Sequence, residues 1–145
     1  MIERVNLPAA LVAQIEDEAR AAYPRECCGL LVGERCGDRV HVFLAHPAAN
    51  VAEGDDRFEI DPQTQFTLLH ALRGTGRAIV GCYHSHPDGF AEPSQSDRLS
   101  AAETDFLWLI VGLTYAAATG VNAFVFDGAK FGPVALYDAL SEEAA

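Results

Sequence analysis

The sequence is poor in basic residues. Of its 145 residues only 10 are Lys or Arg, with a single lysine at Lys130, against 21 Asp and Glu, so the formal net charge is −11. Nucleic-acid phosphates are bound by clustered basic side chains, and an anionic membrane surface attracts the same residues. This composition argues against nucleic acid and against a membrane surface as partners.

The sequence also lacks long hydrophobic runs and paired cysteines. No apolar stretch approaches the roughly 20 residues of a membrane-spanning helix, and acidic residues interrupt the apolar amino-terminal segment, which is unlike a signal peptide. The four cysteines, at 27, 28, 36 and 82, form no C-x-x-C pair, which argues against a four-cysteine zinc site. We therefore expect free thiols and a cytoplasmic location.

What the sequence does contain is enough apolar material for one packed domain. Half of the residues are hydrophobic and 21% are charged, which favours a folded core over disorder. We expect a single domain over residues 1–145, with its core over about 8–137 and a frayed tail over 138–145.

The order of apolar patterns is mixed. Helical spacing and capping residues predict helices over 8–23, 62–73 and 94–105. Short apolar runs predict strands over 26–34, 39–50, 58–60, 77–87, 106–114, 120–128 and 131–140. Helices and strands that alternate in this way predict an α+β, or mixed α/β, fold.

The strongest chemical signal is the stretch HSHPDGFAEPSQSD, residues 84–97. Side chains alternate along a strand, so His84 and His86 point to the same face. Two imidazoles and a carboxylate are a common zinc ligand set with one open position, and Asp97 could supply the carboxylate. Two such histidines also occur hydrogen-bonded without a metal, and Ser94 with Asp97 also fits a helix capping box. Capping and metal binding are compatible, since a carboxylate has two oxygens.

Two further segments join this stretch in a family resemblance. With Glu26 in PRECCGLLVG and the segment NVAEGDDRFEIDP, the motif resembles the JAMM, or MPN-type, zinc metallopeptidases, and the short chain resembles their bacterial and archaeal members. The resemblance runs from about residue 8 to about residue 137. It implies an MPN-like domain in which two to three helices pack on a curved mixed sheet.

The same resemblance implies the roles of the site residues. One Zn²⁺ per chain would be held by His84, His86 and Asp97, with water as the fourth ligand. Glu26 would be the general base and then the proton donor, and Ser94 would help to hold the oxyanion. Bound zinc lowers the pKa of water to about 7, and a carboxylate outside the ligand set can carry the proton. Without these neighbours, Glu26 would be interpreted as a solvated residue between a helix and a strand.

The implied reaction is hydrolysis of the amide bond after the C-terminal Gly-Gly of a ubiquitin-like or sulfur-carrier protein. The alternatives are a catalytically inactive MPN-type scaffold and a broad-specificity metallopeptidase. A zinc nucleobase deaminase would need H-x-E and P-C-x-x-C, which the sequence lacks. A structural zinc site would need four protein ligands, and only three are found. A homodimer is compatible with the resemblance, but the residues do not indicate one.

Overall fold

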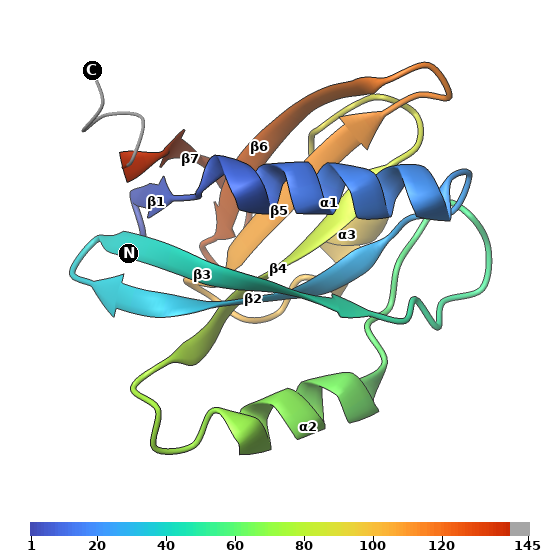
Figure 1. The fold of residues 1–145 in the computed structure, drawn as a ribbon. Coiled ribbons are helices and arrows are strands. Elements are labelled where there is room, and N and C mark those ends of the chain that lie inside the picture. The colour runs from blue at the N-terminus through green and yellow to red at the C-terminus, as the bar shows by residue number, and fades with distance from the viewer. Residues whose placement is uncertain (140–145) are drawn as a thin grey trace.

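The computed structural model describes residues 1–139, which contain seven strands and three helices (Figure 1). The strands are β1 Arg4–Asn6, β2 Cys28–Cys36, β3 Arg39–Ala48, β4 Ala78–His86, β5 Leu107–Leu113, β6 Ala118–Phe126 and β7 Phe131–Tyr137. The helices are α1 Ala9–Ala22, α2 Pro62–Ala71 and α3 Gln95–Ser100. Residues 140–145 of the predicted frayed tail lie outside the described residues.

One mixed sheet joins all of these strands in the order β1-β3-β2-β4-β5-β6-β7. β4 runs parallel to β5, whereas β2 is antiparallel to both β3 and β4. β1 runs parallel to both β3 and β7 and so closes the sheet into a barrel. The predicted α+β fold is confirmed. The closing strand β1 was not predicted, because three residues carry too little alternation to indicate a strand.

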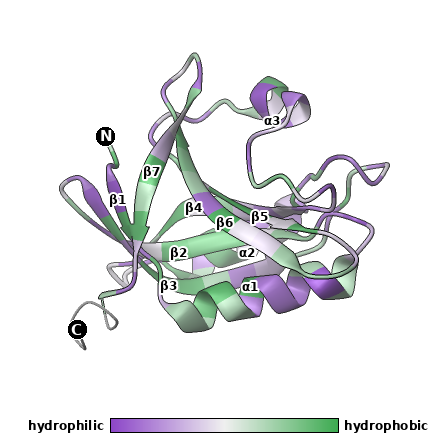
Figure 2. Ribbon diagram, turned by 90° about the horizontal axis from the view of Figure 1, so that it is seen from above, coloured by the Kyte–Doolittle hydropathy of each residue, from purple (hydrophilic) through white to green (hydrophobic). Residues whose placement is uncertain are grey.

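Each face of the sheet carries an apolar cluster, since neighbouring residues of a strand point to opposite faces. On one face, Ile15 and Ala19 of α1 pack with Leu31 of β2 and Leu109 of β5. On the other face, Leu68 of α2 belongs to a cluster with Leu30, Val32, Cys82 and Trp108. Figure 1 shows α1 and α2 on opposite sides of β2 and β3, and Figure 2 shows the hydrophobic colouring of these strands.

The helices begin much as the sequence predicts. Pro62 opens α2 directly after Asp61, whose carboxylate accepts the backbone N–H of Gln63 at 3.0 Å. Ser94 caps α3 and Asp97 completes a capping box. Among the described residues, no helix is both long enough and apolar enough to cross a membrane.

Two predicted elements are half as long as expected or less. The helix predicted over 94–105 ends at Ser100, and Asp105 has a positive φ of 56°. The Asp105 carboxylate accepts the N–H of Ile2 at 2.7 Å and also binds Arg35, so this segment follows the sheet instead of continuing the helix. The brief strand predicted over 58–60 is a single bridge between Asn50 and Ile60.

Candidate metal centre

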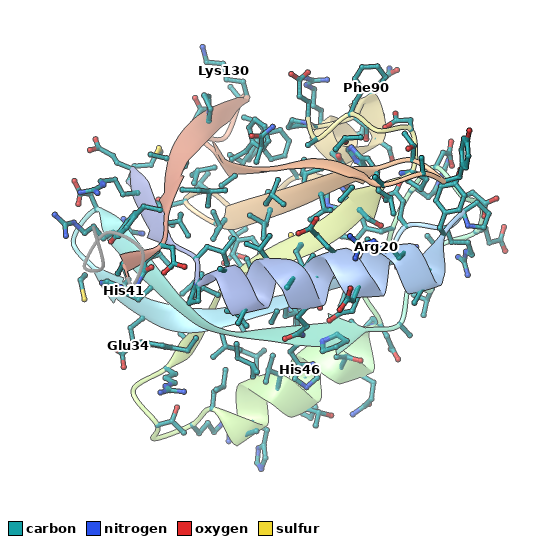
Figure 3. All side chains as sticks on the ribbon, turned by 45° about the horizontal axis from the view of Figure 1, so that its top comes forward. Arg20, Glu34, His41, His46, Phe90 and Lys130 are labelled. Carbon is teal, nitrogen blue, oxygen red and sulfur yellow. The ribbon has the colours of Figure 1, made fainter. Side chains whose placement is uncertain are left out.

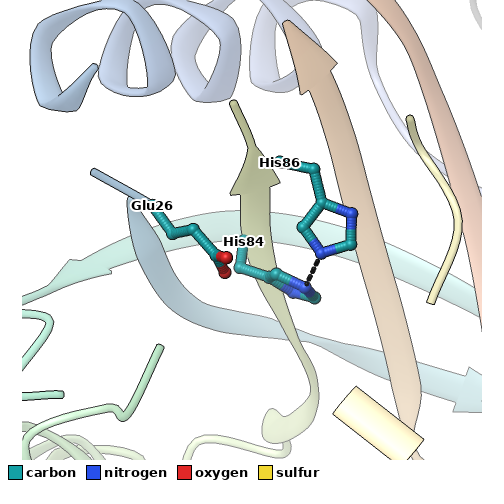
Figure 4. Close-up of side chains that lie close together, drawn as sticks. All are labelled: Glu26, His84 and His86. Atoms are coloured by element: carbon teal, nitrogen blue, oxygen red, sulfur yellow. Dashed lines mark hydrogen bonds between the residues drawn. The ribbon is translucent and has the colours of Figure 1, made fainter. Parts of the chain in front are cut away.

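Strand β4 places two histidines at its carboxyl end. His84 lies opposite Cys28 of β2 and beside Ile110 of β5, so backbone pairing on both sides fixes its position. Both imidazoles are buried. They point toward each other and toward the carboxyl group of Glu26 (Figure 4).

Helix α3 brings Asp97 to these rings. Its Oδ2 atom lies 3.1 Å from Nε2 of His84 and 3.1 Å from Nε2 of His86. The same oxygen accepts the backbone N–H of Ser94 at 2.9 Å, while Ser94 Oγ accepts the N–H of Asp97 at 3.1 Å. The capping box and the contact with the histidines therefore coexist. The capping bond and the histidine contacts use the same carboxylate oxygen, Oδ2, whereas the sequence alone suggests a separate oxygen for each.

The hydrogen bonds of His86 determine which ring nitrogen is free. Its Nδ1 atom lies 2.8 Å from the carbonyl oxygen of Phe90. A carbonyl can only accept, so Nδ1 carries the hydrogen and the neutral ring keeps a lone pair on Nε2. This Nε2 lies 2.9 Å from Nε2 of His84 and 3.1 Å from Asp97 Oδ2. Two imidazole nitrogens and a carboxylate oxygen thus meet at one point, and that donor set suits Zn²⁺.

Glu26 lies between α1 and β2, where neighbouring groups hold its backbone. Asn50 Nδ2 donates to the carbonyl oxygen of Glu26 at 2.9 Å. The next residue, Cys27, exchanges two hydrogen bonds with Ser85, one from its own N–H to Ser85 Oγ at 2.8 Å and one from the Ser85 N–H at 3.1 Å. The Glu26 side chain is only 4% exposed. Its Oε1 atom is buried without a hydrogen-bond partner among the described residues.

Burial raises the pKa of Glu26 from 4.5 to about 8, with His86 acting to lower it and the Asp97 carboxylate acting to raise it. Glu26 therefore binds a proton more strongly than an exposed glutamate does. Burial also lowers the pKa of His84. Burial acts to raise the pKa of Asp97, but its hydrogen bonds with His84 and His86 outweigh that effect and lower it well below its usual range.

A cleft of about 770 Å³ opens over this group. Glu26, His86 and Ser94 contribute to its lining, so a ligand in the cleft can reach all three. The other lining residues are Pro24, Asp55, Asp56, Arg57, Pro87, Asp88, Gln95, Ser96 and Leu99. The structure thus brings together all five residues that the sequence indicates, and the cleft gives a ligand access to them. These residues are Glu26, His84, His86, Ser94 and Asp97.

The side chains and the carbonyl group that surround the site could not be identified from the sequence. The Phe58 ring stacks on His84, and the Asn50 side chain donates to the backbone carbonyl of Glu26. The Phe90 carbonyl oxygen accepts the hydrogen bond from His86. Asn50 and Phe58 lie within NVAEGDDRFEIDP, so the family resemblance marked their segment without indicating a role for either side chain. The Phe90 carbonyl carries no side-chain signal at all. The four cysteines are free thiols, as expected.

The chain is similar to several known proteins. A family model described as prokaryotic homologs of the JAB domain matches residues 8–127. The chain is 35% identical over 102 residues to a desampylase of Haloferax volcanii, covering 70% of this chain and 72% of that protein. It is 30% identical over 111 residues to a CysO-cysteine peptidase of Mycobacterium tuberculosis, covering 77% of this chain and 72% of that protein.

A solved structure shows the same architecture. The solution structure of a protein from Desulfitobacterium hafniense superposes with a TM-score of 0.77 at 29% sequence identity, covering 92% of this chain and 93% of that one.

Proposed function

The chain belongs to the prokaryotic JAB family of JAMM-type hydrolases, and on that premise we propose that it is a zinc-dependent peptidase acting on ubiquitin-like proteins. The bond it cuts is the amide after a C-terminal Gly-Gly of a ubiquitin-like or sulfur-carrier protein. One observation carries this proposal. The Nε2 atoms of His84 and His86 and Oδ2 of Asp97 lie within 3.1 Å of one another, and a carboxylate oxygen of Glu26 lies within 4.8 Å of both histidine rings' ligand nitrogens.

In this proposal His84, His86 and Asp97 hold one zinc ion. When bound, the ion supplies a Lewis acid for the scissile carbonyl and lowers the pKa of a coordinated water to about 7. Three protein ligands would fit a catalytic rather than a structural zinc site.

Glu26 acts as the general base and then as the proton donor. Its Oε1 atom has no hydrogen-bond partner among the described residues and its side chain lines the cleft, so the carboxylate is available to take a proton from the attacking water. The same carboxyl group would then deliver that proton to the leaving amine nitrogen. Ser94 Oγ accepts the N–H of Asp97, which leaves the hydroxyl hydrogen free to donate to the developing oxyanion.

The substrate class rests on the relatives and on the chemistry of the tail. The names of the two relatives, a desampylase and a CysO-cysteine peptidase, support a protein adduct as the substrate. A diglycine has no Cβ atom and can lie extended in a narrow cleft. A few main-chain contacts give little affinity after the tail is ordered, so the folded body of the partner must supply most of the binding.

Mass spectrometry on zinc-loaded protein tests the proposal. The panel contains folded ubiquitin-like proteins from the source genome, each with a C-terminal extension or an isopeptide-linked lysine, and unfolded peptides of the same terminal sequence. We expect cleavage after Gly-Gly on folded partners alone, with Glu26→Gln protein as the blank. Efficient cleavage of the unfolded peptides would indicate a broad metallopeptidase. Zinc binding without any cleavage across the panel would indicate an inactive scaffold.

A further inference from the structure

The loop between β4 and α3 carries the group that orients His86. The Phe90 carbonyl oxygen accepts the hydrogen of His86 Nδ1 at 2.8 Å. The Phe90 side chain is 68% exposed and points outward from the molecule (Figure 3), so its own packing does little to fix this carbonyl. Other contacts must hold the loop in place.

Two side chains of β6 hold the loop on either side of Phe90. Thr119 Oγ1 donates to the carbonyl oxygen of Gly89 at 2.7 Å. Asn122 Nδ2 donates to the carbonyl oxygen of Ala91 at 3.0 Å. The carbonyl groups immediately before and after that of Phe90 are therefore both bound to the same strand.

Gly112 of β5 provides the space in which this docking occurs. A Cβ atom at position 112 would lie 2.5 Å from Thr119 Oγ1, 2.8 Å from the Gly89 carbonyl oxygen and 3.1 Å from the Ala91 nitrogen. Two of these three atoms belong to the loop backbone, which a side-chain rotation cannot move aside. Glycine is thus required here by the close approach of the loop.

We propose that Gly112, Thr119 and Asn122 are positioning residues that hold His86 in its metal-binding orientation through the loop at 87–93. None of the three lines the cleft over the histidines, and none is a proposed metal ligand. They fix the Phe90 carbonyl, which keeps the hydrogen of His86 on Nδ1 and the lone pair of Nε2 directed at the site. Such outer partners of metal-binding histidines typically contribute about 10- to 100-fold to metal affinity. The inference rests on the proposed zinc site of His84, His86 and Asp97.

The decisive test compares two glycine-to-alanine substitutions in neighbouring parts of the sheet. Gly112→Ala places a methyl group against the loop, whereas Gly132→Ala in β7 has nothing within 4 Å of the added Cβ. The zinc Kd of each protein is measured by competition with a chromophoric chelator. We expect about tenfold weaker binding for Gly112→Ala and no change for Gly132→Ala. Equal Kd values for the two variants would overturn the inference.

A milder pair of variants guards against a folding defect in Gly112→Ala. Thr119→Val removes the hydroxyl with little change of shape, and Thr119→Ser keeps it. We expect Thr119→Val to weaken zinc binding about threefold, in keeping with one lost hydrogen bond, and Thr119→Ser to restore it. In the Gly112→Ala background, Thr119→Val should have no further effect, because the loop has already moved. Full additivity of the two effects would contradict a shared mechanism.

A spectroscopic measurement separates positioning from general stability. In long-range ¹H–¹⁵N spectra of the zinc-loaded protein, the Nδ1–H signal of His86 should broaden or shift in Thr119→Val and be unchanged in Gly132→Ala. An unchanged signal alongside a lowered melting temperature would mean that Thr119 serves stability alone. If the unsubstituted protein binds no zinc, the proposed function itself fails. If it binds zinc and all four variants match it, the failure belongs to this inference.

Discussion

The ring of Phe58 lies nearly flat against the imidazole of His84, with ring centroids 4.1 Å apart and planes inclined by 20°. The Trp108 ring approaches the same imidazole edge-on, with centroids 5.8 Å apart. Between these two aromatic rings His84 is completely buried. An apolar surround of this kind excludes water from a metal ligand and strengthens its electrostatic interactions.

Phe58→Ala should expose the His84 imidazole to water on one side. We expect the free energy of unfolding to fall by about 2 kcal/mol, since Phe58 is only partly buried, and zinc affinity to fall about tenfold. Phe66→Ala is the matched control, because the Phe66 side chain on α2 is 68% exposed. Chelator competition and chemical denaturation measure the two quantities. A loss of stability with an unchanged zinc Kd would show that Phe58 only packs.

The contrast between Phe58 and the histidines shows what a sequence can predict here. His84 and His86 are two apart on one strand, so alternation alone places them on one face. Ser94 and Asp97 are three apart at a helix start, and the capping box fixes their geometry. Each of these relationships is local. The strand β4 and the start of α3 could therefore be predicted together with the direction of their side chains.

Phe58, Asn50 and Gly112 could not be predicted in the same way. Asn50 meets Glu26 across 24 positions of sequence, and Gly112 faces a loop that begins 25 positions before it. Their roles depend on which strands become neighbours in the sheet, and no periodic pattern records that. The closing strand β1 is too short for a periodic pattern, and its pairing with β3 and β7 comes from tertiary contacts.

The ligand set is tested by substitutions that keep the fold. His84→Ala should abolish stoichiometric zinc binding. Asp97→Asn should weaken it by at least tenfold, although the Asn side-chain oxygen can still accept the N–H of Ser94. His46→Ala is the control, since Nδ1 of His46 lies 3.0 Å from the adjacent Pro47 carbonyl oxygen and His46 does not line the cleft. Elemental analysis after gel filtration gives the stoichiometry, and full zinc occupancy in His84→Ala would remove that residue from the site.

The thiols provide a second check on the ligand set. Burial raises the pKa of Cys27 to about 11 and that of Cys28 to about 12. Among the described residues, neither thiol belongs to the group of side chains that meets at His84 and His86, so neither should bind the proposed zinc. Replacing Cys27 and Cys28 by serine should leave one zinc per chain. A loss of the metal in that variant would show that Cys27 or Cys28 is a zinc ligand.

Glu26→Gln separates a base from a ligand. Glutamine keeps the size of the side chain but cannot take up a proton. We expect zinc to stay bound and kcat to fall by about 10²- to 10⁴-fold, the usual contribution of general acid–base groups. Single-turnover kinetics and elemental analysis on the same preparation measure both. If the substitution removes the metal, Glu26 is a ligand, and if it leaves metal and rate intact, Glu26 has no catalytic role.

The raised pKa of Glu26 also predicts a pH dependence of stability in the metal-free protein. An unfolded glutamate titrates near 4.5, whereas burial moves the folded value to about 8. Between these values the folded chain holds a proton that the unfolded chain has released, so stability falls as pH rises. The contribution is complete below about pH 4.5 and lost by about pH 8.

The Glu26→Gln variant isolates that contribution, because glutamine does not titrate. The unfolding free energy of the metal-free parent minus that of the variant should decrease across this window, by on the order of 5 kcal/mol at most. Zinc should flatten the dependence, since a nearby cation lowers the pKa of the carboxyl group. Urea denaturation at several pH values measures the difference. A constant difference from pH 5 to pH 8 would mean that Glu26 is not buried as a carboxyl group.

Asn50 should act mainly by positioning the base. Its Nδ2 donates to the carbonyl oxygens of Glu26 at 2.9 Å and Arg57 at 3.1 Å. Its Oδ1 accepts the N–H groups of Ala52 and Glu59, each at 3.0 Å. One side chain thus joins the backbone of Glu26 to the loop that follows β3. Asn50→Ala should lower kcat about tenfold by releasing Glu26 from its productive geometry.

The zinc Kd should rise modestly in Asn50→Ala, because Asn50 also binds the backbone on both sides of Phe58, which stacks on His84. Asn50→Asp divides the two roles of the side chain. It keeps an oxygen for both loop N–H groups but loses the donor, and a carboxylate oxygen then faces the carbonyl of Glu26. We expect kcat to fall as far as in Asn50→Ala, because the lost donor is the group that anchors Glu26. Near-normal turnover in Asn50→Asp would mean that the loop contacts suffice and that Glu26 is held by Ser85 and Cys27 alone.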